Sequence, residues 1–310
     1  MIEPDKLADS TAAETGEAWA IPHFGTLRIS GDDAASFLQG QLCNDVRKLD
    51  EAHAQLTGLS DAKGRLQAIA YALSPHPDTI DLILPKEIIE PVAAILGRYV
   101  LRARLQITDF SDSVELAAVS GPAVPVWLTA NGLAQAAPGP MAVTAAADAR
   151  LIRLPGLDNT FLLHQRPGAY PIAADSGEKW ELQRIRAGDP TIFASSRGLF
   201  VAQMTNLDLL DGISFEKGCY TGQEVVARTQ HLGKIKRRMF RFAVPGGHNP
   251  EPGTVLTNGG QKVGNVVRSA GAECLAVVRT DALAGEVRAK LPETSAALEL
   301  LSLPYPVAAP

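Results

Sequence analysis

The change of pattern near residue 236 constrains the fold of this chain more than any other feature of its sequence. Beyond it, the runs 235–244, 253–270 and 273–280 read as strands separated by Gly and Asn-Gly turns. Before it, apolar runs with strand spacing alternate with runs of helical spacing. The sequence therefore predicts an α+β body followed by a small all-β domain.

A chain of 310 residues is too long to be organised around one simple hydrophobic core, so two or more domains are expected. We predict a disordered lead-in over 1–18, a first α+β lobe over 19–110, a second α+β lobe over 111–235 and the all-β domain over 236–310. In the first lobe, segment 61–64 supplies the turn of a hairpin. The run 85–99 predicts a helix interrupted near Pro91, and the alternating run 99–110 predicts a strand with Leu101 on its apolar face.

Composition and charge indicate a cytoplasmic protein. The formal net charge is −5, which argues against a surface wholly devoted to nucleic acid. The N-terminus lacks a basic segment followed by an apolar one, and no apolar run is long enough to cross a bilayer. The three cysteines, Cys43, Cys219 and Cys274, lie far apart, so neither a disulfide framework nor a metal site is expected.

The stretch 217–224, Lys-Gly-Cys-Tyr-Thr-Gly-Gln-Glu, is the strongest candidate for chemistry. Thr221 and Glu224 have the spacing of a capping box, so Thr221 is predicted to cap a helix. Cys219 would then lie two residues before the positive end of that helix, which favours a thiolate, and the Lys217 ammonium could strengthen the effect. A capped helix with an incidental cysteine explains the same residues without chemistry, and the pattern alone leaves both interpretations open.

The longer stretch KGCYTGQEVVAR (217–228) resembles the signature of the YgfZ family, folate-binding proteins related to the aminomethyltransferase (T-protein) of glycine cleavage. Other segments resemble the family in the same order: FLQGQLCNDV (37–46), KGRL (63–66), YVLRARLQI (99–107), IRAGDP (185–190), QMTNLDLLDGISFEKGCYTGQE (203–224) and GKIKRR (233–238). The resemblance covers most of residues 20–310. Its central block is specific, because few other families carry K-G-C-[aromatic]-x-G-Q-E.

This resemblance implies both a fold and a function. The expected fold is α+β, a GcvT-like ring of two mixed α/β lobes around a central folate cavity, plus a C-terminal small β-barrel. The expected function is binding of tetrahydrofolate, or a one-carbon derivative, in support of iron–sulfur cluster assembly or repair and, indirectly, of tRNA modification. Cys219 is the residue on which the family is thought to depend. Iron–sulfur client or assembly proteins are the implied partners, and catalytic turnover is left open.

The resemblance also assigns site residues. Cys219 and Lys217 form the expected catalytic pair. Phe24 and Trp180 match two aromatic positions that line the folate site, where their π-faces would stack on the pterin. Packing within the protein core is the alternative for both rings. The motif contributes the other expected folate contacts, namely Tyr220, Gln223, Glu224 and Arg228.

Two other functions are weighed against this one. The first is a folate-dependent aminomethyltransferase, but the segment that resembles its aspartate-bearing run carries Gln67 and Ala68 here, which disfavours that activity. The second is an RNA-contacting module built on a basic cluster: Arg228, Lys234, Lys236, Arg237 and Arg238. The same cluster could hold the glutamate tail of folate, or be a solvated strand edge that blocks edge pairing.

Overall fold

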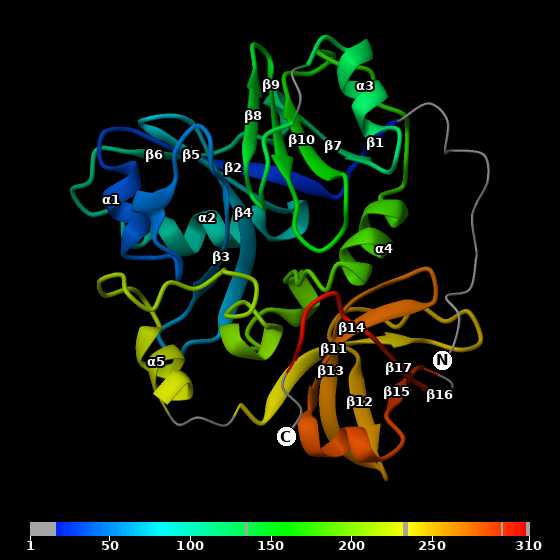
Figure 1. The fold of residues 1–310 in the computed structure, drawn as a ribbon. Coiled ribbons are helices and arrows are strands. Elements are labelled where there is room, and N and C mark those ends of the chain that lie inside the picture. Colours follow the sequence, from blue (N-terminus) through cyan, green and yellow to red (C-terminus); the bar gives the residue numbers. More distant parts are fainter. Residues whose placement is uncertain (1–16, 134–135, 232–234, 293, 308–310) are drawn as a thin grey trace.

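The computed structural model describes residues 17–133, 136–231, 235–292 and 294–307. Figure 1 shows two lobes of mixed helices and strands and, beside them, a barrel formed by the C-terminal part of the chain. Each of these three parts is built on its own antiparallel sheet. In the described ranges, no helix combines the length and the apolar character that crossing a membrane requires.

The first lobe is a five-stranded sheet packed against two helices. In sheet order the strands are β3 (Gln55–Ser60), β4 (Leu66–His76), β5 (Thr79–Pro85), β2 (Phe24–Ser30) and β6 (Gln106–Asp109), and the helices are α1 (Ala34–Gln39) and α2 (Ile89–Gly97). Leu27 and Ile29 alternate along β2 and meet Leu38 of α1 and Leu96 of α2 in one hydrophobic core. The predicted hairpin turn at 61–64 is confirmed, because it joins β3 to β4.

The second lobe takes its first strand from the start of the chain. Its sheet order is β1 (Ala18–Ala20), β7 (Glu115–Ser120), β10 (Thr160–Gln165), β9 (Ala149–Arg153) and β8 (Val143–Ala146), and its helices are α3 (Val124–Ala130) and α4 (Glu178–Arg186). Trp19 of β1 lies opposite Ala118 of β7. Only residues 21–23 separate β1 from β2, so the chain passes there from one sheet to the other.

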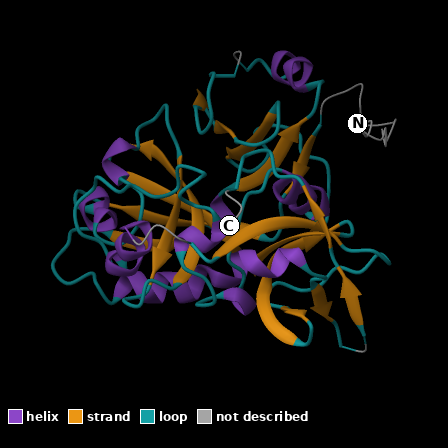
Figure 2. Ribbon diagram, turned by 60° about the horizontal axis from the view of Figure 1, so that its bottom comes forward, coloured by secondary structure: helices purple, strands orange, loops and turns teal. Residues whose placement is uncertain are grey.

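The C-terminal part forms a nearly closed seven-stranded barrel. Its order is β16 (Ser295–Ala297), β15 (Arg288–Lys290), β12 (Val255–Asn258), β13 (Gln261–Ala270), β14 (Glu273–Arg279), β11 (Arg237–Ala243) and β17 (Glu299–Leu301). Phe242, Val266 and Cys274 are among the inward residues of its separate core. Figure 2 shows that helices gather around the first lobe, whereas the barrel is built mainly of strands.

Short helical segments connect these sheets. The 3-10 turns are η1 (Val46–Lys48), η2 (Lys86–Ile88), η3 (Ser111–Ser113), η4 (Ala194–Ser196), η5 (Ala202–Thr205) and η6 (Thr280–Ala284). A last α-helix, α5 (Gln223–His231), follows the KGCYTGQE motif and precedes the barrel.

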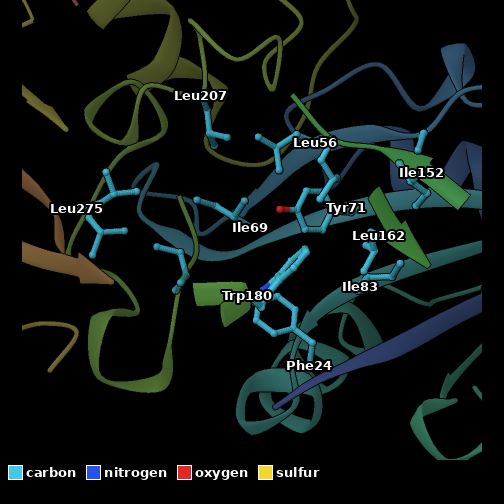
Figure 3. Close-up of a cluster of buried hydrophobic side chains, with 14 of the residues drawn as sticks. Phe24, Leu56, Ile69, Tyr71, Ile83, Ile152, Leu162, Trp180, Leu207 and Leu275 are labelled. Atoms are coloured by element: carbon cyan, nitrogen blue, oxygen red, sulfur yellow. The ribbon is translucent and has the colours of Figure 1, made fainter. Parts of the chain in front are cut away.

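The largest hydrophobic core unites the lobes with the barrel. Trp180 of α4 is 1% exposed and lies near Phe24 and Tyr71, while Leu207 and Leu275 extend the same cluster toward the barrel (Figure 3). Because this core contains residues of all three sheets, the parts of the molecule stabilise one another.

A buried polar seam crosses the same region. Arg268 of β13 donates hydrogen bonds from Nε and Nη2 to the Glu181 carboxylate of α4, each at 2.8 Å, and from Nη1 to the carbonyl of Asp189 at 2.8 Å. The Asp189 carboxylate accepts hydrogen bonds from Tyr71 and, at 3.3 Å, from Arg184. Each buried charge therefore has an opposite charge beside it, which offsets its desolvation.

The strand predicted over 99–110 is mostly wrong, since only Gln106–Asp109 pairs with β2. Leu101 is 87% exposed instead of buried. The physical reason lies at the start of α1, where the Arg104 backbone N–H donates to the Asp33 carboxylate at 2.7 Å. This bond holds the segment in a loop around the helix end, away from the sheet.

The helix predicted near 85–99 is uninterrupted at Pro91. It begins as η2 and continues as α2, so Pro91 falls in the first turn, where a missing N–H costs no helical hydrogen bond. Residues 1–16, which hold most of the expected lead-in, lie outside the described part of the chain. Ala18, by contrast, is a buried strand residue.

Candidate functional site

The exposed thiol of Cys219 lies in the loop between η5 and α5. Cys43 and Cys274 are buried. Burial raises the pKa of the Cys43 thiol, and it raises that of Cys274 to about 12. Of the three cysteines, Cys219 is therefore the one that solvent and partners can reach.

The capping box predicted for Thr221 and Glu224 is wrong. Helix α5 begins at Gln223, whose side-chain oxygen accepts the Tyr220 backbone N–H at 3.0 Å. Thr221 is held elsewhere, because its hydroxyl donates to the Gln41 side chain at 3.3 Å and its backbone N–H donates to the Gly40 carbonyl at 3.1 Å. The end of α1 thus competes for the threonine and fixes the loop before α5. Cys219 lies four residues before the first residue of α5, rather than the three that a cap at Thr221 would give.

Two glycines let the motif approach the β3–β4 hairpin closely. Gly222 has a φ of +84°, and a Cβ at this position would lie 2.6 Å from the Asp61 carbonyl oxygen and 3.0 Å from the Gly64 Cα. A Cβ at Gly64 would lie 2.6 Å from the Val225 Cβ. Two segments that are far apart in the sequence, 61–64 and 222–225, therefore meet without room for a side chain.

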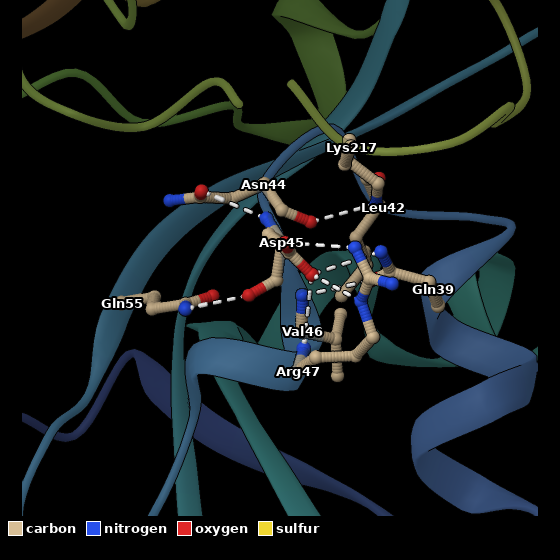
Figure 4. Close-up of polar contacts among 8 residues, drawn as sticks. All are labelled: Gln39, Leu42, Asn44, Asp45, Val46, Arg47, Gln55 and Lys217. Carbon is tan, nitrogen blue, oxygen red and sulfur yellow. Dashed lines mark hydrogen bonds and ion pairs between the residues drawn. The ribbon is translucent and has the colours of Figure 1, made fainter. Parts of the chain in front are cut away.

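Lys217 clamps the motif loop to the segment that follows α1. Its ammonium donates to the carbonyl oxygens of Leu42 and Asn44, each at 2.7 Å (Figure 4), and lies over the Tyr220 ring at 5.1 Å. Burial lowers the pKa of Lys217 to about 8. Among the described residues, its hydrogen bonds go to these two carbonyls, so its observed role is to position the loop that carries Cys219.

Asn44 extends the clamp into the centre of the molecule. Its side-chain amide donates to the Leu56 carbonyl at 3.0 Å and to the Asp211 carbonyl at 2.8 Å. Next to it, the Arg47 guanidinium holds the pKa of Asp45 down to about 2. The 44–47 turn is thus fixed from several sides and connects the first lobe to the loop that precedes Lys217.

A cavity of about 730 Å³ opens beside this turn. It is lined by residues from both lobes, from loop 209–216 and from the C-terminal segment 304–305. Leu56, Ile213 and Phe215 give it apolar walls, and Lys48 and Gln55 are among its polar residues. Gln55 is buried and donates to the Asp45 carbonyl at 2.8 Å, but its side-chain oxygen has no partner among the described residues.

The family resemblance predicted a central cavity between the lobes, but sequence reasoning identified none of the residues that line this one as site residues. Asn44 lies in FLQGQLCNDV, one of the segments that carry the family resemblance, so the sequence contained a signal that could have identified it as a site residue. No comparable signal in the sequence pointed to Gln55 or Phe215. The expected folate contacts Phe24, Trp180, Tyr220, Gln223, Glu224 and Arg228 are absent from the described residues that line it.

Phe24 and Trp180 lie together, but within the core. They are 3% and 1% exposed, and their ring centroids are 5.8 Å apart in an edge-to-face arrangement. Tyr71 meets Trp180 in a similar way at 6.2 Å. In this structure both rings pack against protein, the alternative that the sequence left open, and Phe24 also lines a smaller cavity of about 310 Å³. Their stacking on a pterin stays a prediction.

Only part of the predicted basic cluster is exposed to solvent. Arg238 is buried and pairs with the Asp208 carboxylate at 2.6 and 2.8 Å, so the expectation that it contacts a partner does not hold. Arg228, Lys236 and Arg237 are exposed. Lys234 lies outside the described residues.

The fold and the site define a class of protein. A crystal structure of the glycine cleavage system aminomethyltransferase T from Bartonella henselae superimposes with a TM-score of 0.74 at 16% identity, over 94% of this chain and 86% of that one. Residues 236–301 match the family model described as CAF17, C-terminal beta-barrel domain. The chain thus has an aminomethyltransferase-like fold with a C-terminal barrel.

Sequence comparison gives the family within this class. The tRNA-modifying protein YgfZ of Escherichia coli (strain SE11) is 30% identical over 251 residues, which is 78% of this chain and 74% of the relative. The tRNA-modifying protein YgfZ of Sodalis glossinidius is 28% identical over 310 residues, 94% of this chain and 92% of the relative. The chain belongs to the YgfZ family.

Proposed function

We propose that this protein binds tetrahydrofolate, or a one-carbon derivative, in the 730 Å³ cavity and acts through Cys219 in iron–sulfur cluster assembly or repair, and thereby supports tRNA modification. One observation carries the proposal. The cavity wall formed by Asn44 and loop 209–216 continues directly, through the Lys217 clamp, into the loop that presents Cys219. A ligand in the cavity would therefore touch the residues that hold the cysteine loop.

The cavity fits a folate in size and in chemistry. Its volume lies within the range usual for small-molecule sites, about 300–1,000 Å³. Gln55 lines the cavity and its side-chain oxygen is a buried acceptor without a partner among the described residues, which is costly; a turn of this side chain toward a bound pterin would pair the oxygen with a pterin N–H. Phe215, 47% exposed, offers an aromatic face, and the Lys48 ammonium offers a partner for a glutamate carboxylate. Bound tetrahydrofolate would supply a carrier for one-carbon units.

The role of the motif residues follows from their contacts. Lys217 and Gln223 would fix the loop and helix start around Cys219, since Lys217 ties the loop to the Leu42 and Asn44 carbonyls and the Gln223 side chain accepts the Tyr220 backbone N–H. Tyr220 lies under the Lys217 ammonium, and Glu224 and Arg228 are exposed along α5. One thiolate cannot hold a cluster alone, so a partner protein or a small thiol would supply the other ligands. We place the protein, and with it these partners, in the cytoplasm.

Aminomethyl transfer is the less favoured activity. Gln67 and Ala68 stand at the positions expected to carry aspartates, and the Gln67 side-chain oxygen accepts a hydrogen bond from Arg197 at 3.2 Å. A carboxylate to hold a proton is therefore missing there. Contact with tRNA is a second candidate, because Arg228, Lys236 and Arg237 remain exposed. Neutralising these three should weaken salt-dependent tRNA binding if that contact exists.

The test combines a binding assay and a complementation assay. Tetrahydrofolate titrated calorimetrically into the protein should bind saturably, and Gln55→Met should weaken binding about 5- to 100-fold through loss of the buried acceptor. Gln67→Met, a glutamine outside the cavity lining, is the matched control and should bind like the parent. Absence of saturable binding, or equal affinities for the two variants, would refute the folate site.

In cells that lack the protein, Cys219→Ser should fail to restore iron–sulfur enzyme activity. Cys274→Ser, which changes a buried thiol of the barrel, should restore it if the variant folds. Full rescue by Cys219→Ser would remove the thiol from the proposal.

A further inference from the structure

The last described residues of the chain return from the barrel to the cavity. Pro304 and Tyr305 line the cavity together with residues of both lobes. We name residues 302–307 the C-terminal strap. Figure 1 shows this red segment leaving β17 and running over the barrel toward the centre of the molecule.

Tyr305 anchors the strap by its hydroxyl group. That hydroxyl donates to the Gly188 carbonyl at 2.6 Å and accepts from the Asn206 side-chain amide at 3.4 Å. Asn206 is fully buried and also exchanges hydrogen bonds with the backbone of Met239 in β11. One asparagine therefore ties the strap and the first barrel strand to the segment that leads into the cavity wall.

The docking surface for the strap has no room for a side chain. Gly188 follows α4 with a φ of +68°, and a Cβ there would lie 2.6 Å from Cε1 of Tyr305 and 2.8 Å from Cδ2 of Leu303. Leu303 packs against the large hydrophobic core. Pro304 and Pro306 flank the tyrosine and restrict the backbone, so less conformational entropy is lost when the strap is held in place.

From these contacts we infer that the C-terminal strap is a wall of the ligand site and that Tyr305 is the residue that positions it, so that the strap limits the entry and escape of the ligand. This inference rests on the proposed function for the identity of the ligand, a pterin-type molecule. It assigns to the final segment of the barrel domain a part in a site that is otherwise built by the two lobes.

The experiment compares a chain that ends at Leu303 with one that ends at Val307, which keeps the whole strap. Stopped-flow measurement should give a tetrahydrofolate dissociation rate about tenfold higher for the shorter chain, equivalent to the loss of one or two net interactions. Tyr305→Phe, which removes only the hydroxyl, should raise the rate about threefold to tenfold while lowering the melting temperature by no more than a few degrees. Equal dissociation rates for Tyr305→Phe and the parent would overturn the positioning role.

A second readout needs no folate. In a Cys219→Ser background, Leu210→Cys places a thiol in the cavity wall, and its reaction with an aromatic disulfide reagent should be severalfold faster in the chain that ends at Leu303. Equal labelling rates in the two chains would overturn the wall assignment. If tetrahydrofolate does not bind the parent while labelling still accelerates, the proposed function fails and the strap inference stands.

Discussion

Replacing Gly222 by alanine tests the contact between the motif and the β3–β4 hairpin. A residue other than glycine in the left-handed region costs about 1–2 kcal/mol. The new Cβ would lie 2.6 Å from the Asp61 carbonyl oxygen, about 0.8 Å inside ordinary contact, and that oxygen belongs to backbone and cannot rotate away. Overpacking of this kind costs about 1–3 kcal/mol, so the sum is about 2–5 kcal/mol.

Gly218→Ala is the matched control, because it lies in the same loop and a Cβ there would meet no atom within 4 Å. The assay is urea unfolding followed by circular dichroism, together with the rate at which iodoacetamide alkylates Cys219. We expect Gly222→Ala to lower the free energy of unfolding by the stated amount and to speed alkylation, whereas Gly218→Ala should change stability by less than about 0.5 kcal/mol. If the two variants unfold at the same urea concentration, the close approach inferred at Gly222 is wrong.

Two further predictions concern thiols and pH. Because Cys43 and Cys274 are buried, the native protein should react with one equivalent of a thiol reagent, and the Cys219→Ser variant should not react at all. Labelling of more than one thiol before unfolding would contradict the burial of Cys43 and Cys274. Burial lowers the pKa of His164, which lies 3.4 Å from the Asp81 carboxylate, so the unfolded chain binds more protons there than the folded one once the pH falls below about 6.5. The contribution of His164 to stability should be complete above that pH and decline below it. His164→Gln should therefore make the urea midpoint of unfolding less dependent on pH between 5 and 7. An unchanged pH dependence in this variant would exclude His164 as its source.

The sequence predicted the fold well where local pattern and tertiary contacts agree. The 61–64 turn and the barrel strands have turn residues and alternation that the packed structure also requires. The run 99–110 alternates equally well, yet Arg104 is held at the start of α1 by Asp33, a contact that no local pattern reveals. Tertiary context overrode propensity there.

The motif of the site was predictable from the sequence, whereas the residues that line the cavity were not. Cys219 and Lys217 stand in one recognisable block, whereas Gln55, Phe215 and Tyr305 reach the cavity from segments far apart in the chain. Side chains that converge only after folding leave no spacing signal. The capping box failed for a related reason, because Gly40 and Gln41, which compete for Thr221, lie some 180 residues earlier.

The position of β1 bears on how the chain is made. Ala18 pairs with Val119, so the ribosome must add about 100 residues before the second-lobe sheet can receive its first strand. At typical synthesis rates, this interval is roughly 5 to 20 seconds, during which the first lobe can complete its own sheet while β1 waits unpaired. A fragment that begins at residue 111 would lack β1 altogether and expose the edge of β7 to pairing with other chains. Fusing residues 17–21 to such a fragment is therefore the natural way to keep the second lobe soluble in isolation.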